Sequence, residues 1–209
     1  MAKRRKQVKP DNRLKDDSVR SGLNNVLQVA VVLGQYLDKI DVPWCMIGGV
    51  AFQRWGEPRQ TVDVDATVWT GFGGELPVVL QLLEAFRSRI DEPEAFASQN
   101  RIVLLQSELG TGIDISLGGL PFEQRLVDRS SQWKIPRHGS IRTCSAEDLI
   151  VLKAFASRPQ DWIDVEKVII RQGQKLNQTI IIDELTPLAE LKEEPEILVK
   201  VKRLLESQE

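Results

Sequence analysis

Hydrophobic positions along the chain follow two different spacings, which predicts a mixture of helices and strands. Apolar residues repeat every three or four positions, as on one face of a helix, over residues 18–38, 76–90, 149–157, 159–170 and 185–207, the last interrupted near Pro195. Short runs rich in apolar and β-branched residues, typical of strands, cover residues 42–47, 61–69, 101–107 and 112–117. The pattern predicts an α/β (α+β) fold in which helices flank a mixed-strand core sheet.

The order of these elements predicts three regions. Residues 1–16 form a basic arm that we expect to be flexible, residues 17–143 form the core that contains the strands, and residues 144–209 form a C-terminal helical region. Ser145, with acidic residues behind it, predicts the cap of the first helix in that last region. The basic arm is consistent with a contact to nucleic-acid phosphates and equally with a solvated chain end.

Composition argues against several classes of protein. The 209 residues carry a net charge of −2 and contain no apolar run of the ~18–20 residues that a membrane span requires. No hydrophobic segment follows the basic start, as it would in a secretory signal. Cys45 and Cys144 lie far apart, which argues against a zinc site or a disulfide framework. We therefore expect a cytoplasmic protein with no membrane partner, in which Cys45 is a small core residue.

Two aspartates on the strand over 61–69 are the strongest chemical signal. Side chains at positions i and i+2 of a strand lie on the same face, so Asp63 and Asp65 project together while Val62, Val64 and Ala66 face a core. Two carboxylates this close repel each other unless a cation lies between them. Mg²⁺ suits the pair, because it prefers oxygen ligands and binds one or two carboxylates together with substrate phosphates.

A third acid, Asp114, lies on the strand over 112–117. Its neighbours are isoleucines that we expect to be buried, so its own side chain faces the opposite way. An acid on a hydrophobic strand is costly to bury unless it has a partner. If this strand neighbours the strand of Asp63 and Asp65, three carboxylates converge, which suits a site with two metal ions.

The pair Gly48-Gly49 lies between a strand and a short helix expected over residues 50–55. Glycine at such a turn lets backbone N–H groups approach a phosphate, and a helix N-terminus favours negative charge. Arg59 and Thr61 follow and are expected to reach a triphosphate. Taken singly, the glycine pair is consistent with a simple turn and the Asp-x-Asp with a solvated strand face; their combination in this order favours a nucleotide site.

The segment from Ile47 to Asp65 reads Ile-Gly-Gly-Val-Ala-Phe-Gln-Arg-Trp-Gly-Glu-Pro-Arg-Gln-Thr-Val-Asp-Val-Asp. It resembles the signature of the polymerase-β-like nucleotidyltransferase superfamily, and within it the pattern is most similar to the AbiEii/MenT-type toxin nucleotidyltransferases. The similarity continues into the run 145–153 and the Asp161-x-x-Asp164 motif. The chain departs from the superfamily at Val50, where many members have serine, and from the toxins at Gln160, where lysine is common.

This resemblance implies transfer of a nucleoside monophosphate from an NTP, with Mg²⁺ or Mn²⁺ as cofactor. By position, Gly48 and Gly49 correspond to the residues that hold the phosphates, and Asp63 and Asp65 to metal ligands. Asp114 corresponds to the third metal-binding carboxylate and candidate general base. Lys153 corresponds to a contact with the nucleotide phosphates.

Simpler readings exist for the later residues of the resemblance. A lysine exposed on a helix also fits the sequence around Lys153. Asp161 and Asp164 are consistent with a role in the site and with capping of the helix that Pro159 opens.

The acceptor is less constrained by the sequence. The resemblance implies RNA (tRNA) or a protein as acceptor, in a toxin that has a possible antitoxin partner. The basic arm together with Arg137, His138 and Arg142 favours RNA, although His138 beside a glycine is also typical of a turn. The alternatives are an antibiotic-modifying nucleotidyltransferase and a relative that binds nucleotide or a partner without catalysis. An antibiotic-modifying enzyme needs an acidic pocket for a cationic drug, and the acids near the C-terminus (Glu190, Glu193 and Glu194) do not form an obvious one.

Overall fold

The computed structural model describes the backbone of residues 12–207 and the side chains from Gly22 onward, so most of the basic arm lies outside the described residues. In the described part, seven strands form one mixed sheet in the order β3-β4-β5-β2-β1-β7-β6. The strands are β1 (Trp44–Met46), β2 (Asp63–Trp69), β3 (Arg87–Ser88), β4 (Ile102–Gln106), β5 (Gly112–Gly118), β6 (Ser131–Ile135) and β7 (Gly139–Thr143). The predicted α/β fold is confirmed.

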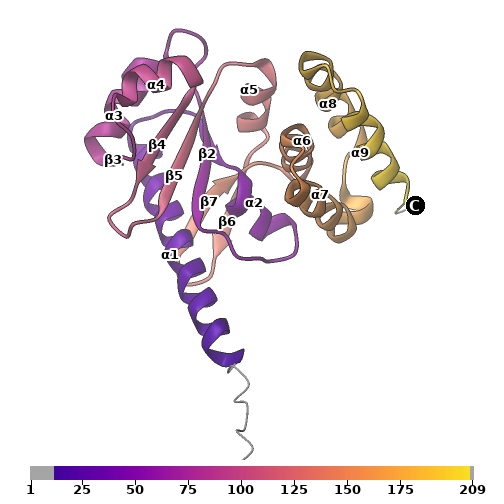
Figure 1. The fold of residues 1–209 in the computed structure, drawn as a ribbon, viewed down its shortest axis with the longest axis horizontal. Helices are drawn as coiled ribbons and strands as arrows, with labels where there is room; N and C mark the ends of the chain where they lie inside the picture. The colour runs from indigo at the N-terminus through magenta and orange to yellow at the C-terminus, as the bar shows by residue number, and fades with distance from the viewer. Residues whose placement is uncertain (1–11, 208–209) are drawn as a thin grey trace, which may run out of the picture.

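Helices flank this sheet and continue beyond it. They are α1 (Asn12–Lys39), α2 (Gly48–Trp55), α3 (Glu75–Ala85), α4 (Pro93–Asn100), α5 (Pro121–Asp128), α6 (Ala146–Ala156), α7 (Pro159–Gln172), α8 (Gln178–Lys192) and α9 (Glu196–Glu206), with a 3₁₀ turn at Gly173–Lys175. Figure 1 shows the sheet at one side of the molecule and α6 to α9 gathered at the other. None of the helices within residues 12–207 is long and apolar enough to cross a membrane.

One face of the sheet packs against α1, α3 and α4. Alternate residues of β2 and β5, among them Val64 and Ile113, are fully buried there together with Leu33 of α1 and Leu82 of α3. Full burial of such a side chain stabilises the fold by about 1.5–3 kcal/mol. The same alternation directs Asp63, Asp65 and Asp114 to the opposite face.

The opposite face carries α2 and the C-terminal helices. Cys45 of β1, Phe52 of α2, Leu149 of α6 and Val165 of α7 belong to one buried cluster, which joins the C-terminal helices to the core. Cys45 is fully buried, which confirms its expected place in the core. The division into three regions stays a prediction.

Ion pairs between α5, α6 and α8 reinforce this packing. Arg129 donates to both carboxylate oxygens of Asp148, which is fully buried, and to Glu184 at 2.8 Å. Arg125 donates to Glu184 through Nε at 2.8 Å and Nη2 at 2.6 Å. Ser145 accepts the backbone N–H of Asp148 at 3.0 Å, which confirms it as the cap of α6.

Several boundaries differ from the sequence-based expectation. The helix predicted over 76–90 ends at Ala85, because Arg87 and Ser88 pair with β4 as an edge strand. Helix α5 was not predicted; Pro121 opens it, and the Glu123 carboxylate accepts the free backbone N–H groups of Gly119 and Leu120. Helix α4 was missed as well. It has eight residues with little amphipathic pattern, and Pro93 stands in its first turn.

The observed ends of three other elements also differ from the predicted ends. Helix α1 is already formed at Asn12, so the helix predicted to begin near residue 18 starts earlier. Helix α8 begins at Gln178, before the predicted start at residue 185, and the expected interruption near Pro195 separates it from α9. Val62 lies just before β2 and is 70% exposed, so its predicted place in the core is wrong.

Candidate active site

Asp63, Asp65 and Asp114 share the face of the sheet that α1 does not cover. Strands β2 and β5 are parallel neighbours, and their register places Asp65 directly opposite Asp114 and Asp63 opposite Gly112. The condition set by the sequence, that the two strands be neighbours, is therefore met. Residues in register on adjacent strands have side chains on the same face, so the fold brings the three carboxylates to one region of the sheet.

The glycine pair lies directly against this face. Gly48 begins α2 with a φ of +52°, a conformation that favours glycine. A Cβ at Gly48 would overlap the carboxylate of Asp65, and one at Gly49 would overlap the hydroxyl of Thr61. The backbone N–H of Gly49 points at Asp65 Oδ2, 3.4 Å away. The sequence therefore has glycine at both positions because the backbone approaches the acidic strand too closely for a side chain.

The environment of Asp65 raises its proton affinity. Burial, followed by repulsion from Asp63, raises the pKa of Asp65 from 3.8 to about 6, against the opposing hydrogen bond from Gly49. Asp63 Oδ1 accepts a hydrogen bond from the Thr61 hydroxyl at 3.3 Å. Burial and the charge of Asp63 both disfavour the ionised form of Asp65, and a neighbouring cation would offset them.

Asp114 has a different environment from the other two acids. Its carboxylate accepts a hydrogen bond from the guanidinium of Arg89, which lies just after β3, and forms an ion pair with it. Burial raises the pKa of Asp114, and the charge of Arg89 opposes that increase. Within the described residues, no three Asp, Glu, His or Cys side chains converge as a metal cluster. Asp114 as a third metal ligand therefore stays a prediction.

A second charged cluster connects the site to the C-terminal helices. Asp164 of α7 is fully buried and accepts two hydrogen bonds from Arg59, at 3.0 Å from Nε and 2.7 Å from Nη2. Lys153 of α6 lies 2.7 Å from the same carboxylate and 3.1 Å from Asp161. Burial acts to raise the pKa of Asp164, but the bonds from Arg59, Lys153 and Gln160 outweigh it and hold that pKa below its ordinary value. Asp164 therefore stays ionised between two cations.

This cluster changes the interpretation of four residues. Lys153 is only 7% exposed, so the alternative of a lysine exposed on a helix is wrong. Asp164 is the partner of Arg59 and Lys153 and is not just a capping acid. Asp161 keeps one carboxylate oxygen, Oδ2, that is buried without a hydrogen-bond partner among the described residues. Arg59 is occupied by Asp164, so its contact with a nucleotide, like that of Lys153, stays a prediction.

The donor set at β2 fits a divalent cation. Asp63 and Asp65 provide two carboxylates on one face without an ion-pair partner among the described residues. Hard cations such as Mg²⁺ prefer this kind of oxygen donor and take further ligands from substrate phosphates. Burial, followed by the charge of Asp63, raises the pKa of Asp65, and a cation beside the two carboxylates would oppose both effects. Asp63 and Asp65 are the residues that would hold such an ion.

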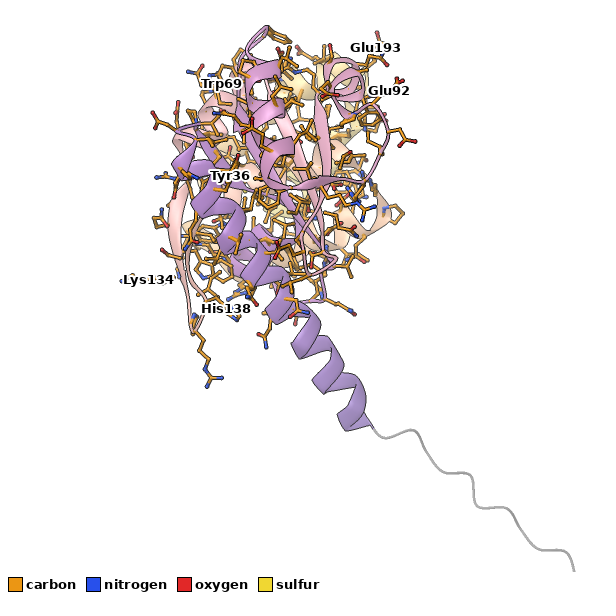
Figure 2. All side chains as sticks on the ribbon, turned by 90° about the vertical axis from the view of Figure 1, so that its left-hand side faces the viewer. Tyr36, Trp69, Glu92, Lys134, His138 and Glu193 are labelled. Atoms are coloured by element: carbon orange, nitrogen blue, oxygen red, sulfur yellow. The ribbon has the colours of Figure 1, made fainter. Side chains whose placement is uncertain are left out.

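Other candidates from the sequence lie away from this face. Arg137 and His138 form the turn between β6 and β7, as expected, and the His138 ring lies 3.4 Å from Asn24 Oδ1 of α1. Figure 2 shows His138 beside α1 at the tip of that hairpin. Arg142 donates to the backbone of Ser130 at 3.3 Å. These residues do not contact the three aspartates.

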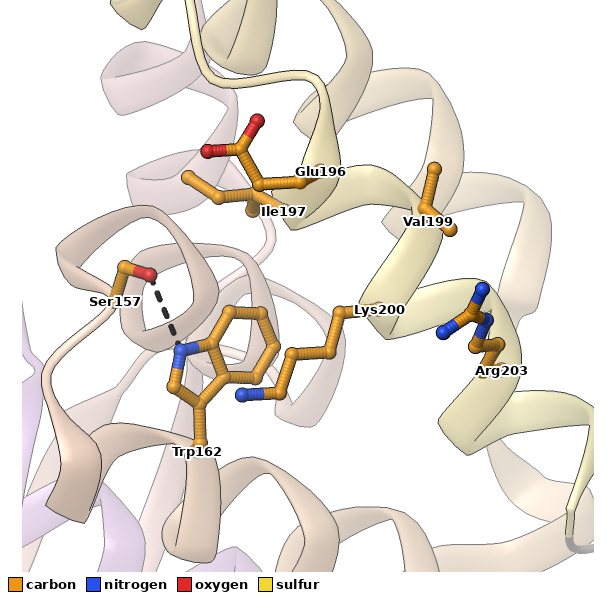
Figure 3. A pocket seen from close by; sticks show the side chains of 7 residues that line it. All are labelled: Ser157, Trp162, Glu196, Ile197, Val199, Lys200 and Arg203. Atoms are coloured by element: carbon orange, nitrogen blue, oxygen red, sulfur yellow. Dashed lines mark hydrogen bonds between the residues drawn. The ribbon is translucent and has the colours of Figure 1, made fainter.

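A pocket of about 440 Å³ lies between α7 and α9 and contains none of the predicted site residues. The Trp162 indole donates a hydrogen bond to Ser157 Oγ at 3.1 Å, and the Lys200 ammonium lies 3.9 Å from the centroid of the indole ring. Figure 3 shows these three side chains at the pocket. Lys200 thus stacks on the ring, a favourable cation–π contact. Trp162 therefore serves the packing of α7 against α9.

Comparison with known proteins gives a fold and no family. No family model matches the sequence, and no curated protein sequence matches it. Among solved structures, the antibiotic-resistance factor ANT(2'')-Ia is similar with a TM-score of 0.54 and 13% identity, covering 82% of this chain and 97% of that chain. An antigenic nucleotidyltransferase-like protein from Paracoccidioides brasiliensis has a TM-score of 0.48 and 18% identity, over 85% and 93% of the two chains. The lincosamide antibiotic adenylyltransferase LnuA has a TM-score of 0.43 and 15% identity, over 68% and 94%.

The likeness to ANT(2'')-Ia shows a shared fold over nearly the full length of that protein. At 13% identity it carries no statement about substrate or residues. The predicted α/β fold, a mixed core sheet flanked by helices, is confirmed, and it is shared with ANT(2'')-Ia.

Proposed function

We propose that this protein is a metal-dependent nucleotidyltransferase that moves a nucleoside monophosphate from an NTP to an acceptor hydroxyl. The observation that carries the proposal is the parallel register of β2 and β5, which sets Asp114 beside Asp65 on the face that carries Asp63 and the Gly48-Gly49 turn. Three carboxylates next to a close backbone approach suit a substrate that brings both phosphates and a divalent ion.

Each residue has a distinct role in this proposal. The N–H groups at Gly48 and Gly49 begin α2, where the helix end favours negative charge, and they bind the phosphates. Asp63 and Asp65 hold the metal ion, which neutralises phosphate charge when bound. We propose that Arg59, Lys153 and Thr61 contact the triphosphate, with Arg59 and Lys153 positioned by their ion pairs with Asp164.

The proposed reaction exchanges one phosphorus–oxygen bond for another. The acceptor hydroxyl oxygen attacks the α-phosphorus, the bond from that phosphorus to the β-phosphate oxygen breaks, and pyrophosphate leaves. Asp114 accepts the hydroxyl proton as general base. The chain contributes mainly position and charge, which provide most of the rate in phosphoryl-type transfer.

For the acceptor we propose RNA, such as tRNA, or a protein, in a toxin with an antitoxin partner. This proposal rests on the likeness of residues 47–65 to the AbiEii/MenT-type toxins. A second candidate is a small hydroxylated molecule such as an antibiotic, which the fold likeness to the antibiotic-resistance factor ANT(2'')-Ia favours. A relative without catalysis is the third candidate, because Asp114 is paired with Arg89.

One labelling experiment distinguishes these candidates. The protein is incubated with Mg²⁺ and each α-³²P-labelled NTP, in the presence of total tRNA, cell protein or a panel of aminoglycosides and lincosamides. Label on tRNA or protein supports the first proposal, and label on a drug supports the second. Nucleotide binding without transfer to any acceptor supports the third and contradicts enzymatic function.

Matched variants link any activity to the proposed site. Asp63→Asn and Asp65→Asn should abolish transfer, and Asp114→Asn should lower its rate by about 10²–10⁴-fold, the usual contribution of a general base. Asp128→Asn, an exposed aspartate on α5, makes the same chemical change away from the site and should leave the rate unchanged. Full activity in the Asp63→Asn and Asp65→Asn variants would contradict the metal assignment.

A further inference from the structure

Arg89 lies across the acidic face of the sheet. Its guanidinium pairs with Asp114, and its Nη1 lies 3.3 Å from the place that a Cβ on Gly112 would occupy. Asp63 is in register with Gly112, and its Cβ is 3.9 Å from that same place. The arginine thus passes over β5 where that strand has no side chain, and both Arg89 and Asp63 lie close to this position.

The backbone around Arg89 is held, while its side chain is not enclosed. The Arg89 N–H donates to the Leu104 carbonyl at 3.0 Å, and Leu104 is in register with Asp114 on the neighbouring strand. Ser88 Oγ both donates to the Ile90 carbonyl at 2.7 Å and accepts the Ile90 N–H at 3.1 Å, which fixes the turn. The Arg89 and Asp114 side chains are 34% and 30% exposed. The guanidinium can therefore leave Asp114 without unfolding any element.

Arg89 is also the one cation paired with the three aspartates among the described residues. Asp63 and Asp65 have no ion-pair partner there. A carboxylate bound to an arginine has an oxygen occupied by a donor and a positive charge beside it, so a divalent ion is repelled. An ion pair this exposed is worth little, so a divalent ion with phosphate ligands can replace it.

We infer that Arg89 is a built-in counter-ion that occupies the metal-binding position at Asp114 and is displaced when a divalent cation binds there. This inference rests on the proposed function, because it concerns the same three carboxylates. Asp63 and Asp65 form the stronger cation site, and Asp114 adds a weaker one whose affinity is set by competition with Arg89. Arg89 is therefore a positioning residue, which pairs with the Asp114 carboxylate until the ion arrives.

Direct Mn²⁺ binding tests this without any acceptor or turnover. Free Mn²⁺ is measured by electron paramagnetic resonance during titration of the full chain with Mn²⁺ alone. Arg89→Gln keeps a long polar side chain but removes the charge. It should raise the Mn²⁺ affinity of the weaker class of site two- to tenfold. This is the range expected when an exposed ion pair and its repulsion of the metal ion are lost. Arg89→Lys keeps the charge, so this variant should bind Mn²⁺ with the affinity of the wild type.

Three controls complete the test. Arg87→Gln removes an exposed charge from β3, two residues away, and should leave both classes of site unchanged. Asp114→Asn should remove the weaker class, and in that background Arg89→Gln should have no effect on Mn²⁺ affinity. Thermal unfolding in EDTA reports whether each variant is folded, so that a change in binding is not a change in folded fraction.

The possible results separate this inference from the proposed function. Mn²⁺ binding that is unchanged or weakened by Arg89→Gln overturns the inference and leaves the proposed function in place. An absence of Mn²⁺ binding in the wild type and in every variant overturns both. A second class of site that is seen only after Arg89→Gln supports the inference, because the wild-type arginine then outcompetes the ion.

Discussion

Asp164 and Arg59 are 105 residues apart in the sequence and meet in a two-pronged ion pair. The arginine lies in the loop before β2, while the aspartate is fully buried on α7. Lys153 binds the same carboxylate. A single acid from the C-terminal helices therefore fixes two cations that lie beside the acidic strand, and the position of those cations depends on α7.

Asp164→Asn is expected to weaken both the fold and nucleotide binding. Loss of the buried negative charge leaves Arg59 and Lys153 without their common partner. Breaking a buried ion pair costs about 3–5 kcal/mol. The cost is smaller here, because the Arg59 side chain is 30% exposed and asparagine keeps one hydrogen-bond acceptor. We expect a loss of about 2–3 kcal/mol in the free energy of unfolding and weaker NTP binding. Urea unfolding and equilibrium dialysis with labelled NTP measure the two effects.

Glu57→Gln is the matched control for this variant. Glu57 pairs with Lys167 of α7 at 2.6 Å, so it also joins the loop after α2 to α7, but its side chain is 67% exposed. Solvent screens such a pair, so we expect no change in the unfolding midpoint or in NTP binding. Equal losses in Glu57→Gln and Asp164→Asn would contradict a specific role for Asp164.

Asp65 makes the stability of the metal-free protein depend on pH. Because its pKa is raised from 3.8 to about 6, the folded state binds a proton more tightly than the unfolded state does. Its contribution to stability is complete below about pH 4 and is lost as the pH rises through 6. Asp65→Asn cannot ionise, so relative to the wild type it should gain about 1–3 kcal/mol between pH 4 and 7.5. Urea unfolding in EDTA measures this, and a difference that does not change with pH would contradict it.

The proposed metal-binding role of Asp65 makes metal affinity depend on the same pKa. Only the ionised carboxylate of Asp65 binds a divalent cation, so Mn²⁺ affinity should fall as the pH decreases below about 6. Isothermal titration at pH 5, 6, 7 and 8 measures this change. An affinity that is constant over this range would show that Asp65 does not bind the ion.

Gly48→Ala should disturb Asp65 more than the backbone. Gly48 has a φ of +52°, and an added Cβ would lie 2.6 Å from Cγ of Asp65. We expect at least a tenfold loss in Mn²⁺ affinity, in addition to the ~1–2 kcal/mol that an L-residue costs in this conformation. Gly71→Ala has the same backbone cost at φ +66° but meets nothing within 4 Å, so it should lose stability and keep metal affinity. Equal Mn²⁺ affinity in the two variants would be evidence against the close packing of Gly48 on Asp65.

Glu184→Gln tests the ion pairs that join α8 to α5. Glu184 is 6% exposed and accepts hydrogen bonds from Arg125 and Arg129. Replacing it with neutral glutamine leaves two arginines short of a countercharge, so we expect a loss of about 1–3 kcal/mol in the free energy of unfolding. Glu190→Gln, on the exposed face of α8, should have no such effect. Thermal unfolding of the two variants measures the difference.

The sequence predicted where several candidate site residues lie, because the signals for their positions are local. Alternation along a strand placed Asp63 and Asp65 on one face, because side-chain direction in a strand depends only on position. The glycine pair, the strand before it and α2 were also predicted, because each is indicated by a short run of consecutive residues. The sequence did not predict that β2 pairs with β5; this pairing was only the condition under which the three aspartates would share one face. Sheet order depends on contacts between distant segments, which local pattern does not show.

The charged partners could not be predicted from local pattern. Arg89 follows a two-residue strand, and its contact with Asp114 spans 25 residues. The apolar residues Phe86 and Ile90 continue the spacing of α3, so the sequence extended the helix over a segment that pairs with β4 instead. For Asp164 a signal existed in the Asp-x-x-Asp motif, but the motif does not show that its partner is Arg59.

The order of the parts along the chain has a consequence for synthesis. Domains fold from the N-terminus as the ribosome advances at about 5–20 residues per second, so Asp164 is made about 5–20 s after Arg59. During that interval the nascent chain already contains Gly48, Asp63 and Asp65 but lacks the acid that fixes Arg59. A ribosome that stalls before α7 therefore presents the proposed metal-binding acids before Asp164 can hold Arg59.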